Sequence, residues 1–180
     1  MEIRRARSDG LDEAGRVTAA AYREFAPPGD EMWEQYLGHI ADAASRARRT
    51  TVLVAVDGDG RILGSATLEL TGRAEDDDDR PVPPDEAHVR MLGVDPSARR
   101  RGVGRALMQA CERMAADAGR TRLTLNTTER MSAARRMYER LGYVRTADRA
   151  LPSGLILLGY ERSTAERVTA LTRPPNHSRF

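Results

Sequence analysis

The sequence predicts a mixed α/β (α+β) fold, in which helices pack against one sheet, within a single domain that covers residues 1–162. Three observations support this prediction. Short apolar and β-branched runs alternate along the chain with longer stretches whose apolar residues recur at helical spacing. The length of 180 residues fits one domain. Charged residues make up 31% of the chain, and every apolar run is shorter than the roughly 20 residues that a membrane-spanning helix needs.

The first part of the chain is expected to form a strand at residues 2–6, two helices and a hairpin. Ser8 or Asp9 can cap the first helix, which should run to about Tyr22. After the break at residues 27–30, a second helix is predicted because apolar residues recur on one face: Met32, Trp33, Tyr36, Leu37 and Ile40. Strand-like runs at 51–56 and 62–70 flank turn residues, which predicts an antiparallel hairpin.

The second part of the chain begins with residues 71–85, which carry Glu75, the aspartates at 76–79 and three prolines. This composition predicts a long flexible loop, and its acidic run is either a solvated linker or a surface that attracts a cationic amine. The remaining pattern predicts strands and helices in the order strand 87–94, helix 102–118, strand 122–126, helix 129–141, and strands 143–146 and 155–160. Charge and Pro174-Pro175 predict a disordered tail at 163–180.

Composition excludes several classes of protein. Cys111 is the single cysteine, so an intrachain disulfide is impossible, and three scattered histidines do not provide the spacing of a zinc site. The formal net charge of +2 is too balanced to argue for nucleic-acid binding. The first five residues lack the apolar centre of a secretory signal, and we therefore expect a cytoplasmic protein.

The segment from Met91 to Leu107 carries the strongest chemical signal, because it ends a strand and opens a helix. The first N–H groups of a helix have no internal partners and carry the positive end of its dipole, so they suit a phosphate. Glycine at 102 and 104 lets a ligand approach the main chain, and nearby arginines add positive charge. The segment therefore predicts a ligand with a diphosphate group, and the alternative is a tight turn with solvated arginines.

Two motifs in the expected order extend this signal. Arg99-x-x-Gly102-x-Gly104 follows a Val-Asp-Pro turn, and Ala134-x-x-x-Tyr138-x-x-Leu141-Gly142-Tyr143 lies downstream. Together they resemble the GNAT superfamily of acyl-CoA-dependent N-acyltransferases. The likeness in element order covers residues 2–161, and the motifs occupy residues 88–143. One departure is Met131, where many relatives have asparagine. A dinucleotide-binding interpretation of the same glycines is weaker, because Leu107 replaces the third small residue.

The resemblance implies a mostly antiparallel, twisted sheet whose fourth and fifth strands run parallel and splay apart, with coenzyme A in the cleft between them. It implies acetyl-CoA as the cosubstrate. Leu92 and Val94 would offer backbone groups to the pantetheine arm, and the Val94 N–H would polarise the thioester oxygen. Asn126 would line the side of the fifth strand. The pyrophosphate would be held by Arg99, Arg100, Gly102, Val103, Gly104 and Arg105.

The same resemblance suggests the groups that move protons. Tyr138 would protonate the departing thiolate, or it is a core tyrosine on the stripe of its helix. His88 stands where relatives place a carboxylate base on the fourth strand, and a histidine titrates near neutrality. It would accept the amine proton, or it is a structural residue. Glu69 and Glu86 are the alternatives, and a base is dispensable if the amine enters neutral. Cys111 is expected to be buried.

We therefore expect an N-acetyltransferase that transfers an acetyl group directly from acetyl-CoA to a primary amine of a small molecule, peptide or protein. The rivals are a non-catalytic acyl-CoA-binding module, which would not need Tyr138, and a protein-interaction domain on the same fold. Trp33 and Tyr36 are weak candidates for acceptor specificity. A homodimer is compatible with the resemblance, because many relatives pair through their outer strands. The acceptor, the acyl length and the base are left open by the sequence.

Overall fold

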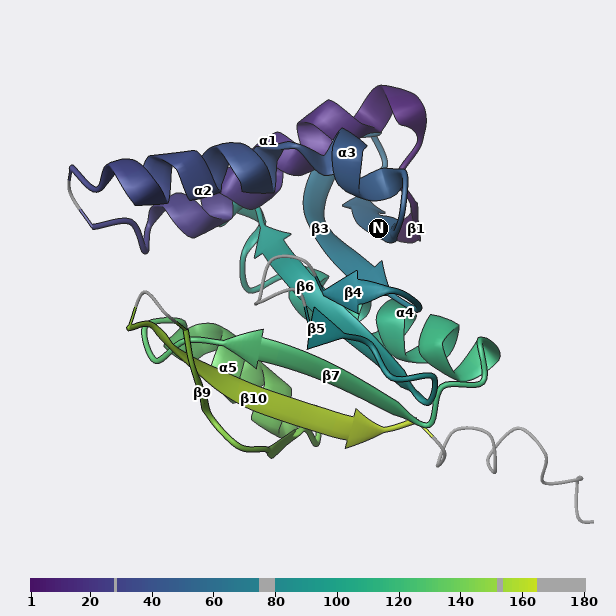
Figure 1. Ribbon diagram of the computed structural model, residues 1–180. Coiled ribbons are helices and arrows are strands. Elements are labelled where there is room, and N and C mark those ends of the chain that lie inside the picture. Colours follow the sequence, from purple (N-terminus) through teal and green to yellow (C-terminus); the bar gives the residue numbers. More distant parts are fainter. Residues whose placement is uncertain (28, 75–79, 152–153, 165–180) are drawn as a thin grey trace, which may run out of the picture.

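Strand-forming and helix-forming segments assemble into one mixed sheet between two layers of helices (Figure 1). The computed structural model describes residues 1–27, 29–74, 80–151 and 154–164. The strand order is β1-β2-β3-β6-β7-β10-β8, and β9 pairs with β10. The strands of this sheet are β1 (Glu2–Arg5), β2 (Thr51–Val56), β3 (Ile62–Glu69), β6 (Glu86–Val94), β7 (Arg122–Thr127), β8 (Val144–Arg145), β9 (Arg149–Ala150) and β10 (Ile156–Ser163).

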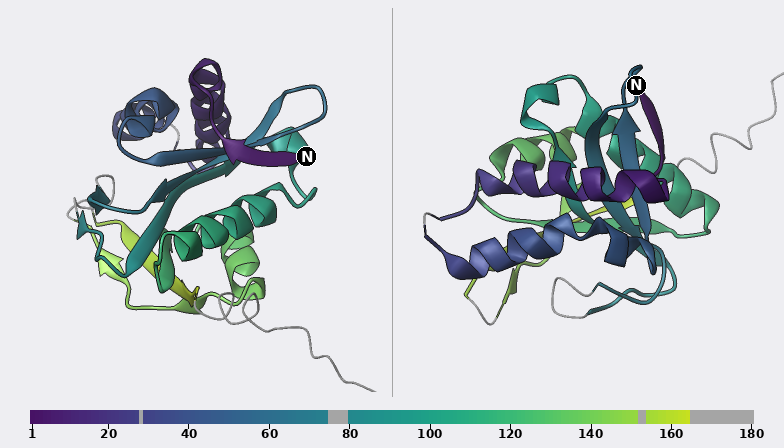
Figure 2. Two further views of the ribbon diagram at one scale, coloured as in Figure 1. Left: turned by 90° about the vertical axis from the view of Figure 1, so that its right-hand side faces the viewer. Right: turned by 90° about the horizontal axis from the view of Figure 1, so that it is seen from above.

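The helices divide between the two faces of the sheet (Figure 2). One face carries α1 (Leu11–Arg23), α2 (Glu31–Ala41) and α3 (Ala43–Ala47), and the other carries α4 (Val103–Asp117) and α5 (Ser132–Arg140). The main core lies on the α4 side, where the predicted stripe residues Val103, Leu107 and Ala110 are buried. Within the described residues, no helix is both long and apolar enough to cross a membrane.

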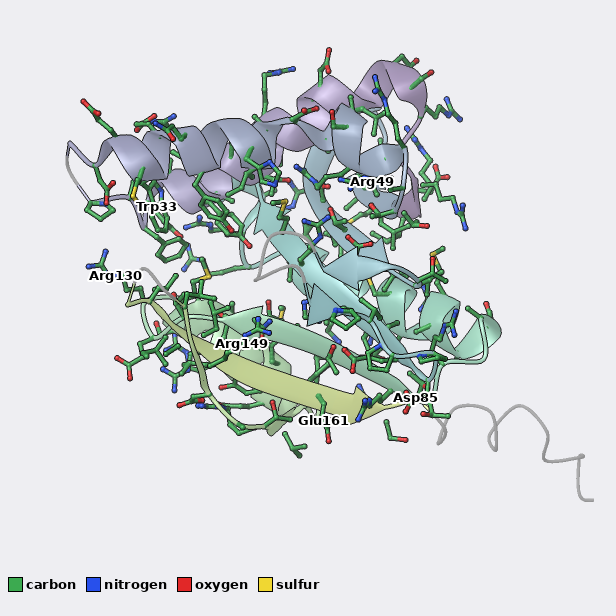
Figure 3. The ribbon with its side chains drawn as sticks, viewed as in Figure 1. Trp33, Arg49, Asp85, Arg130, Arg149 and Glu161 are labelled. Atoms are coloured by element: carbon green, nitrogen blue, oxygen red, sulfur yellow. The ribbon has the colours of Figure 1, made fainter. Side chains whose placement is uncertain are left out.

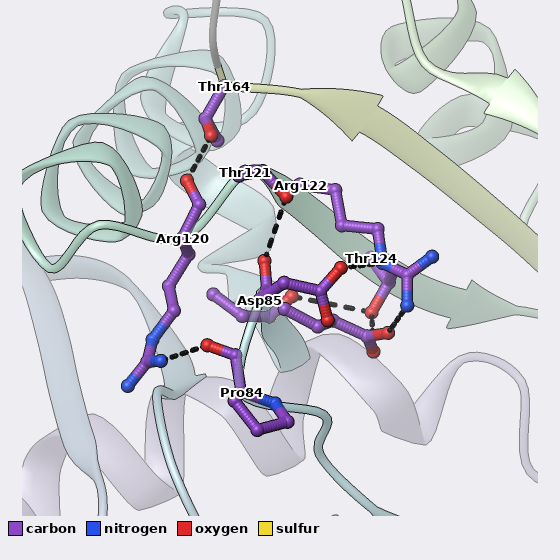
Figure 4. A network of polar contacts seen from close by, with 9 residues as sticks. Pro84, Asp85, Arg120, Thr121, Arg122, Thr124 and Thr164 are labelled. Atoms are coloured by element: carbon purple, nitrogen blue, oxygen red, sulfur yellow. Dashed lines mark hydrogen bonds and ion pairs between the residues drawn. The ribbon is translucent and has the colours of Figure 1, made fainter.

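The parallel strands β6 and β7 are held together at one end and separate at the other. Their pairing runs from Glu86↔Arg122 to Val89↔Leu125 and ends there, before the last five residues of β6. A polar network closes the paired end (Figure 4). The carbonyl of Asp85 accepts from the Thr121 N–H at 2.8 Å, and the guanidinium of Arg122 lies 3.1 Å from the carboxylate of Glu86. The splay predicted for the two parallel strands, which are β6 and β7 in this structure, is thus confirmed.

A bulge in β6 changes the direction in which its side chains point. Thr67 pairs with Arg90 and Ser65 pairs with Gly93, so β6 has one residue more than β3 over this stretch. Met91 accommodates the extra residue with a φ of 50°. Before the bulge, Val89 faces the α4 core, whereas Met91 packs with Leu37 and Ile40 of α2. A β6 residue and its neighbour two positions on therefore face opposite sides of the sheet when the bulge lies between them.

The first helices confirm the predicted order and differ in their ends. Ser8–Gly10 is a 3-10 turn, so the long helix begins at Leu11 with Gly10 as its N-cap, rather than after Ser8 or Asp9. Asp30 caps α2 by accepting from the Trp33 N–H at 3.1 Å. The sequence pattern missed α3, because its five residues are too few to show a helical period.

Later elements also differ from the prediction in detail. The expected loop at 71–85 contains a short hairpin of β4 (Arg73–Ala74) and β5 (Arg80–Pro81), and the acidic run at 75–79 lies outside the described residues. The strand β9 was missed, since its residues look like loop sequence. The last helix begins at Ser132 rather than Glu129. Of the tail predicted at 163–180, Ser163 ends β10 and Thr164 donates from its N–H to the Thr121 carbonyl at 2.9 Å, and residues 165–180 lie outside the described residues.

Candidate active site

A cleft of about 1090 Å³ opens where β6 separates from β7, beside the N-terminus of α4. Residues from the C-terminal end of α1, the end of β6, the start of α4 and one side of α5 line it. The structure brings eight of the residues predicted from the sequence together here: Leu92, Val94, Arg99, Arg100, Gly102, Val103, Gly104 and Arg105. Of the described residues that line the cleft, none is Tyr138, His88 or Asn126.

The backbone that enters α4 is shaped to hold an anion. Asp95 starts a 3-10 turn by accepting from the Ser97 N–H at 2.8 Å. Arg100 and Gly102 then have φ values of 60° and 79°, in the left-handed region. The first main-chain bond of α4 runs from the Ala106 N–H to the Gly102 carbonyl at 3.0 Å, so the N–H groups of residues 103–105 precede the helical ladder. Successive N–H groups in such a turn form a concave site for phosphate.

Gly104 is required by the close approach of α4 to α5. A Cβ at this position would lie 3.1 Å from Sδ of Met137 and 3.6 Å from Cγ2 of Val94, both of which line the cleft. Any larger side chain would therefore intrude into the cleft or push the helices apart. The role of Gly102 is different, because its positive φ is the conformation that favours glycine.

The charge of the cleft is strongly positive. Five arginines line it, namely Arg99, Arg100, Arg105, Arg130 and Arg140. Glu24, near the end of α1, is the one carboxylate among the described lining residues, and it accepts from Arg99 Nη1 at 2.7 Å. Arg130 donates to the carbonyl of Phe25 at 3.3 Å and lies below α2 in the view of Figure 3. The sequence did not predict these two hydrogen bonds, because their partners lie 75 and 105 residues apart along the chain.

Tyr138 lies beside the cleft, within the core. Its ring is 5% exposed and contacts the rings of Tyr143 and Tyr160, at centroid distances of 6.0 and 5.9 Å. Burial raises the pKa of its phenol well above the ordinary value. On the same helical stripe, Ala134 and Leu141 do line the cleft. The hydroxyl group thus belongs to a side chain that is protonated at neutral pH and is adjacent to the cleft wall.

His88 and Asn126 lie on the opposite face of the sheet from α4. Val89 and Leu125 point into the core beneath α4, so the alternating neighbours His88, Thr124 and Asn126 point the other way. His88 is 1% exposed, and its Nδ1 lies 2.8 Å from Oγ1 of Thr124. The predicted acid and the predicted base therefore flank the parallel strand pair from its two sides.

The two alternative bases are each held by an arginine. Glu69 forms a buried ion pair with Arg90, with Nη2 and Oε1 2.6 Å apart. Burial raises the pKa of the Glu69 carboxyl, and the charge of Arg90 opposes that rise. Glu86 is 3% exposed and is paired with Arg122.

Cys111 is inert in this arrangement. Its side chain is fully buried in the main core, and burial raises the pKa of its thiol to about 12. Because the thiolate is the nucleophilic form, a fully buried thiol with a raised pKa is a poor nucleophile at neutral pH.

The aromatic pair of α2 packs inward. The rings of Trp33 and Tyr36 meet edge to face at 5.8 Å, against a small cluster with Leu37, Ile40 and Met91. Met91 is the bulge residue of β6, so the pair connects α2 to the strand that borders the cleft. Both rings are half-buried.

Comparison with known proteins places this geometry in context. Residues 18–143 match the family model described as acetyltransferase (GNAT) family. The chain is 34% identical over 124 residues to an aminoglycoside N(6')-acetyltransferase type 1 from Klebsiella aerogenes, which covers 65% of this chain and 79% of that relative.

Solved structures share the fold. The ribosomal-protein-S18-alanine N-acetyltransferase from Escherichia coli has a TM-score of 0.64 at 19% identity, with 99% of both chains covered. A GNAT-family acetyltransferase from Staphylococcus aureus Mu50 has a TM-score of 0.67 at 16% identity, covering 91% of this chain and 98% of that one. A Salmonella typhimurium structure with its cofactor acetyl-CoA has a TM-score of 0.63 at 19% identity, with 91% and 94% covered.

Proposed function

Because this chain belongs to the acetyltransferase (GNAT) family, we propose that it transfers an acetyl group from acetyl-CoA directly to a primary amine of a small molecule, peptide or protein. The observation that carries the proposal is the arginine-lined cleft at the N-terminus of α4. A module that only binds acyl-CoA would share this cleft. The match to an N-acetyltransferase at 34% identity favours the enzyme.

The residues of the cleft fit acetyl-CoA. The pyrophosphate would be held by the N–H groups of Val103, Gly104 and Arg105, with the guanidinium groups of Arg99 and Arg100 beside them. The backbone of Leu92 and Val94 borders the cleft where β6 has left β7, and would hold the pantetheine arm. Met131 also lines the cleft, so a thioether would contact the ligand where the family resemblance implies an asparagine amide in many relatives. Bound acetyl-CoA supplies the activated acetyl group as a thioester.

We assign the acid role to Tyr138. A tyrosine phenol is protonated at neutral pH, so Tyr138 has a proton to donate to the departing thiolate. The stripe of α5 that it shares with Ala134 and Leu141 supports a position near the thiol end of the cleft.

We assign the base role to His88, which would take the proton that the attacking amine loses. With His88 as the base, the acceptor would have to reach it from the side of the sheet opposite α4. Glu69 and Glu86 are the less suitable candidates, because each is engaged by an arginine. Asn126 shares this face and would contact the acceptor rather than line the cleft.

The acceptor is proposed to be a cationic polyamine of the aminoglycoside class. The relative from Klebsiella aerogenes acts on such compounds by its name, and it aligns with 124 residues of this chain.

We also propose a homodimer that forms through the outer strands. Val144 of the edge strand β8 is 59% exposed, and Leu155 and Ile156, at the start of β10, are 40% and 44% exposed. Exposed apolar side chains on outer strands are typical of a surface that another chain covers.

A thioester-cleavage assay against a panel of aminoglycosides, simple amines and peptide amino termini tests the function. We expect acetyl-CoA to raise the melting temperature and at least one amine to accelerate thioester cleavage. Tyr138→Phe should lower kcat within the roughly 100- to 10,000-fold range of a general acid, with the thermal shift unchanged. Stabilisation by acetyl-CoA without turnover on any amine would instead identify a binding module.

A further inference from the structure

A chain of short polar contacts runs across the parallel strands on the face away from α4. Nδ1 of His88 lies 2.8 Å from Oγ1 of Thr124, and that hydroxyl donates to Oε1 of Glu86 at 2.6 Å. The other carboxylate oxygen of Glu86 lies 3.1 Å from Nη2 of Arg122. The register of β6 and β7 places Glu86 opposite Arg122 and His88 opposite Thr124, so the sheet itself aligns the four side chains.

The number of protons available to these polar contacts fixes the tautomer of the imidazole. A threonine hydroxyl has one proton and two lone pairs. The ion pair with Arg122 favours the ionised form of Glu86, which can only accept, and a contact of 2.6 Å to a carboxylate is typical of a charge-assisted O–H donor. The other acceptor within reach, the Ala87 carbonyl, is 3.3 Å away. With the hydroxyl proton directed to Glu86, Oγ1 can only accept from His88, so Nδ1 must carry a proton.

We propose that Thr124, oriented by Glu86, is a positioning residue that holds neutral His88 as its Nδ1–H tautomer and makes Nε2 the nitrogen that accepts the proton of the acceptor amine. The catalytic part of this proposal rests on the proposed role of His88 as base. In the transfer, the amine nitrogen bonds to the acetyl carbon as the carbon–sulfur bond breaks. The amine proton passes to Nε2 while Nδ1 keeps its own.

The charged groups around His88 come from three strands. Glu69 of β3 is its cross-strand neighbour, Arg90 follows it on the same face of β6, and Arg122 and Glu86 lie at the paired end. Glu69 is engaged by Arg90, and Glu86 by Arg122 and Thr124. Among the contacts described for His88, the one with the hydroxyl of Thr124 reaches Nδ1 and so sets that nitrogen apart from Nε2.

Nitrogen NMR of the wild-type protein tests the tautomer without any substrate. The chain has three histidines, and the His88 signals are identified by their loss in His88→Ala. At a pH where the nitrogen shifts show the His88 ring to be neutral, we expect Nδ1 to be the protonated nitrogen. The isosteric Thr124→Val should abolish that preference, and Thr124→Ser should restore it. A neutral His88 protonated at Nε2 in the wild type would overturn the proposal.

Kinetics of the same variants test the catalytic part. Thr124→Val should lower kcat at least about tenfold, a part of the contribution expected of a base, while stabilisation by acetyl-CoA persists because Thr124 lies outside the cleft. Thr124→Ser should recover most of the rate. Thr121→Val is the matched control, since its hydroxyl contacts the Asp85 carbonyl in the same network and does not contact the imidazole. An altered tautomer with unchanged kcat would overturn the positioning role and leave acetyl transfer itself intact.

Discussion

At the scale of single residues, Gly104 decides how much room the cleft has. A Cβ there already lies 3.1 Å from Met137, so Gly104→Val should fill the space proposed for the pyrophosphate. We expect the variant to fold, as seen by circular dichroism, and to lose the rise in melting temperature that acetyl-CoA gives. Gly38→Val is the control, because a Cβ on Gly38 of α2 meets nothing within 4 Å. A folded Gly104→Val protein that is stabilised as much as the wild type would contradict the pyrophosphate assignment.

Glu24 is the residue that competes with the ligand. Its carboxylate holds Arg99 at 2.7 Å within a cleft that we propose for a polyanion, so an incoming phosphate must displace it or share the guanidinium. Both side chains are more than a third exposed, and such pairs contribute at most about 1 kcal/mol. Glu24→Gln should therefore lower the Kd for acetyl-CoA by up to about fivefold in calorimetric titrations.

The control for Glu24 is a similar ion pair outside the cleft. Glu34→Gln breaks the exposed contact between Arg23 and Glu34 at 3.1 Å and should leave the Kd unchanged. Weaker binding in Glu24→Gln would show that Glu24 orients Arg99 for the ligand instead of competing with it.

At the scale of elements, the turn between β6 and α4 is stabilised by Asp95. Its hydrogen bonds with Ser97 and its ion pair with Arg61 hold the pKa of the Asp95 carboxyl below the ordinary value of 3.8. A lowered carboxyl pKa adds stability at pH values above 3.8, and this contribution is lost as the pH falls through the folded-state pKa.

Asp95→Asn should accordingly reduce the free energy of unfolding at neutral pH and change it little below the folded-state pKa of Asp95, measured by urea denaturation across the acidic range. The wild type and the variant should thus converge as the pH falls. Asp59→Asn, in the hairpin turn between β2 and β3, serves as a carboxylate control away from the cleft. A difference between Asp95→Asn and the wild type that does not change with pH would disprove the electrostatic origin.

Elements with strong local signals could be predicted from the sequence. The start and end of α4 follow from Gly102 and Gly119, whose positive φ values are local requirements of helix ends. By contrast, α3 depends on tertiary contacts. Arg46 is 2% exposed and donates to the carbonyls of His39, Ile40 and Asp42, thereby satisfying the end of α2. An arginine in a polar stretch gives no sequence signal for such burial.

At the scale of the whole molecule, the exposed apolar edge around β8 predicts self-association. Val144→Asp should convert a dimer to a monomer in sedimentation velocity, because a carboxylate buried in an apolar interface is left without a partner. Met32→Asp is the control, since Met32 is even more exposed, at 69%, but lies on α2, away from this edge. A wild-type protein that sediments as a monomer at high concentration would refute the dimer.

The candidate site was predictable where its residues are contiguous and not where the sheet brings them together. The run from Arg99 to Arg105 forms one wall of the cleft, as its glycines and arginines indicate. The ion pair of Glu24 with Arg99 and the placement of His88 behind the strand pair depend on how distant segments pack. For Tyr138, the helical stripe correctly indicated a buried ring, and its catalytic role stays a prediction.

The extra residue in β6 lets one strand border the cleft on one face of the sheet and carry the proposed base on the other. Without it, His88 and the two cleft residues Leu92 and Val94 would share a face, since all three positions are even-numbered. The bulge at Met91 reverses the alternation of the side chains. Residue 88, before it, therefore faces the proposed acceptor, and residues 92 and 94, after it, face the proposed cofactor. Deleting Met91 would remove the bulge and turn the side chains of Leu92 and Val94 toward α1 and α2, while every motif in the sequence stayed intact.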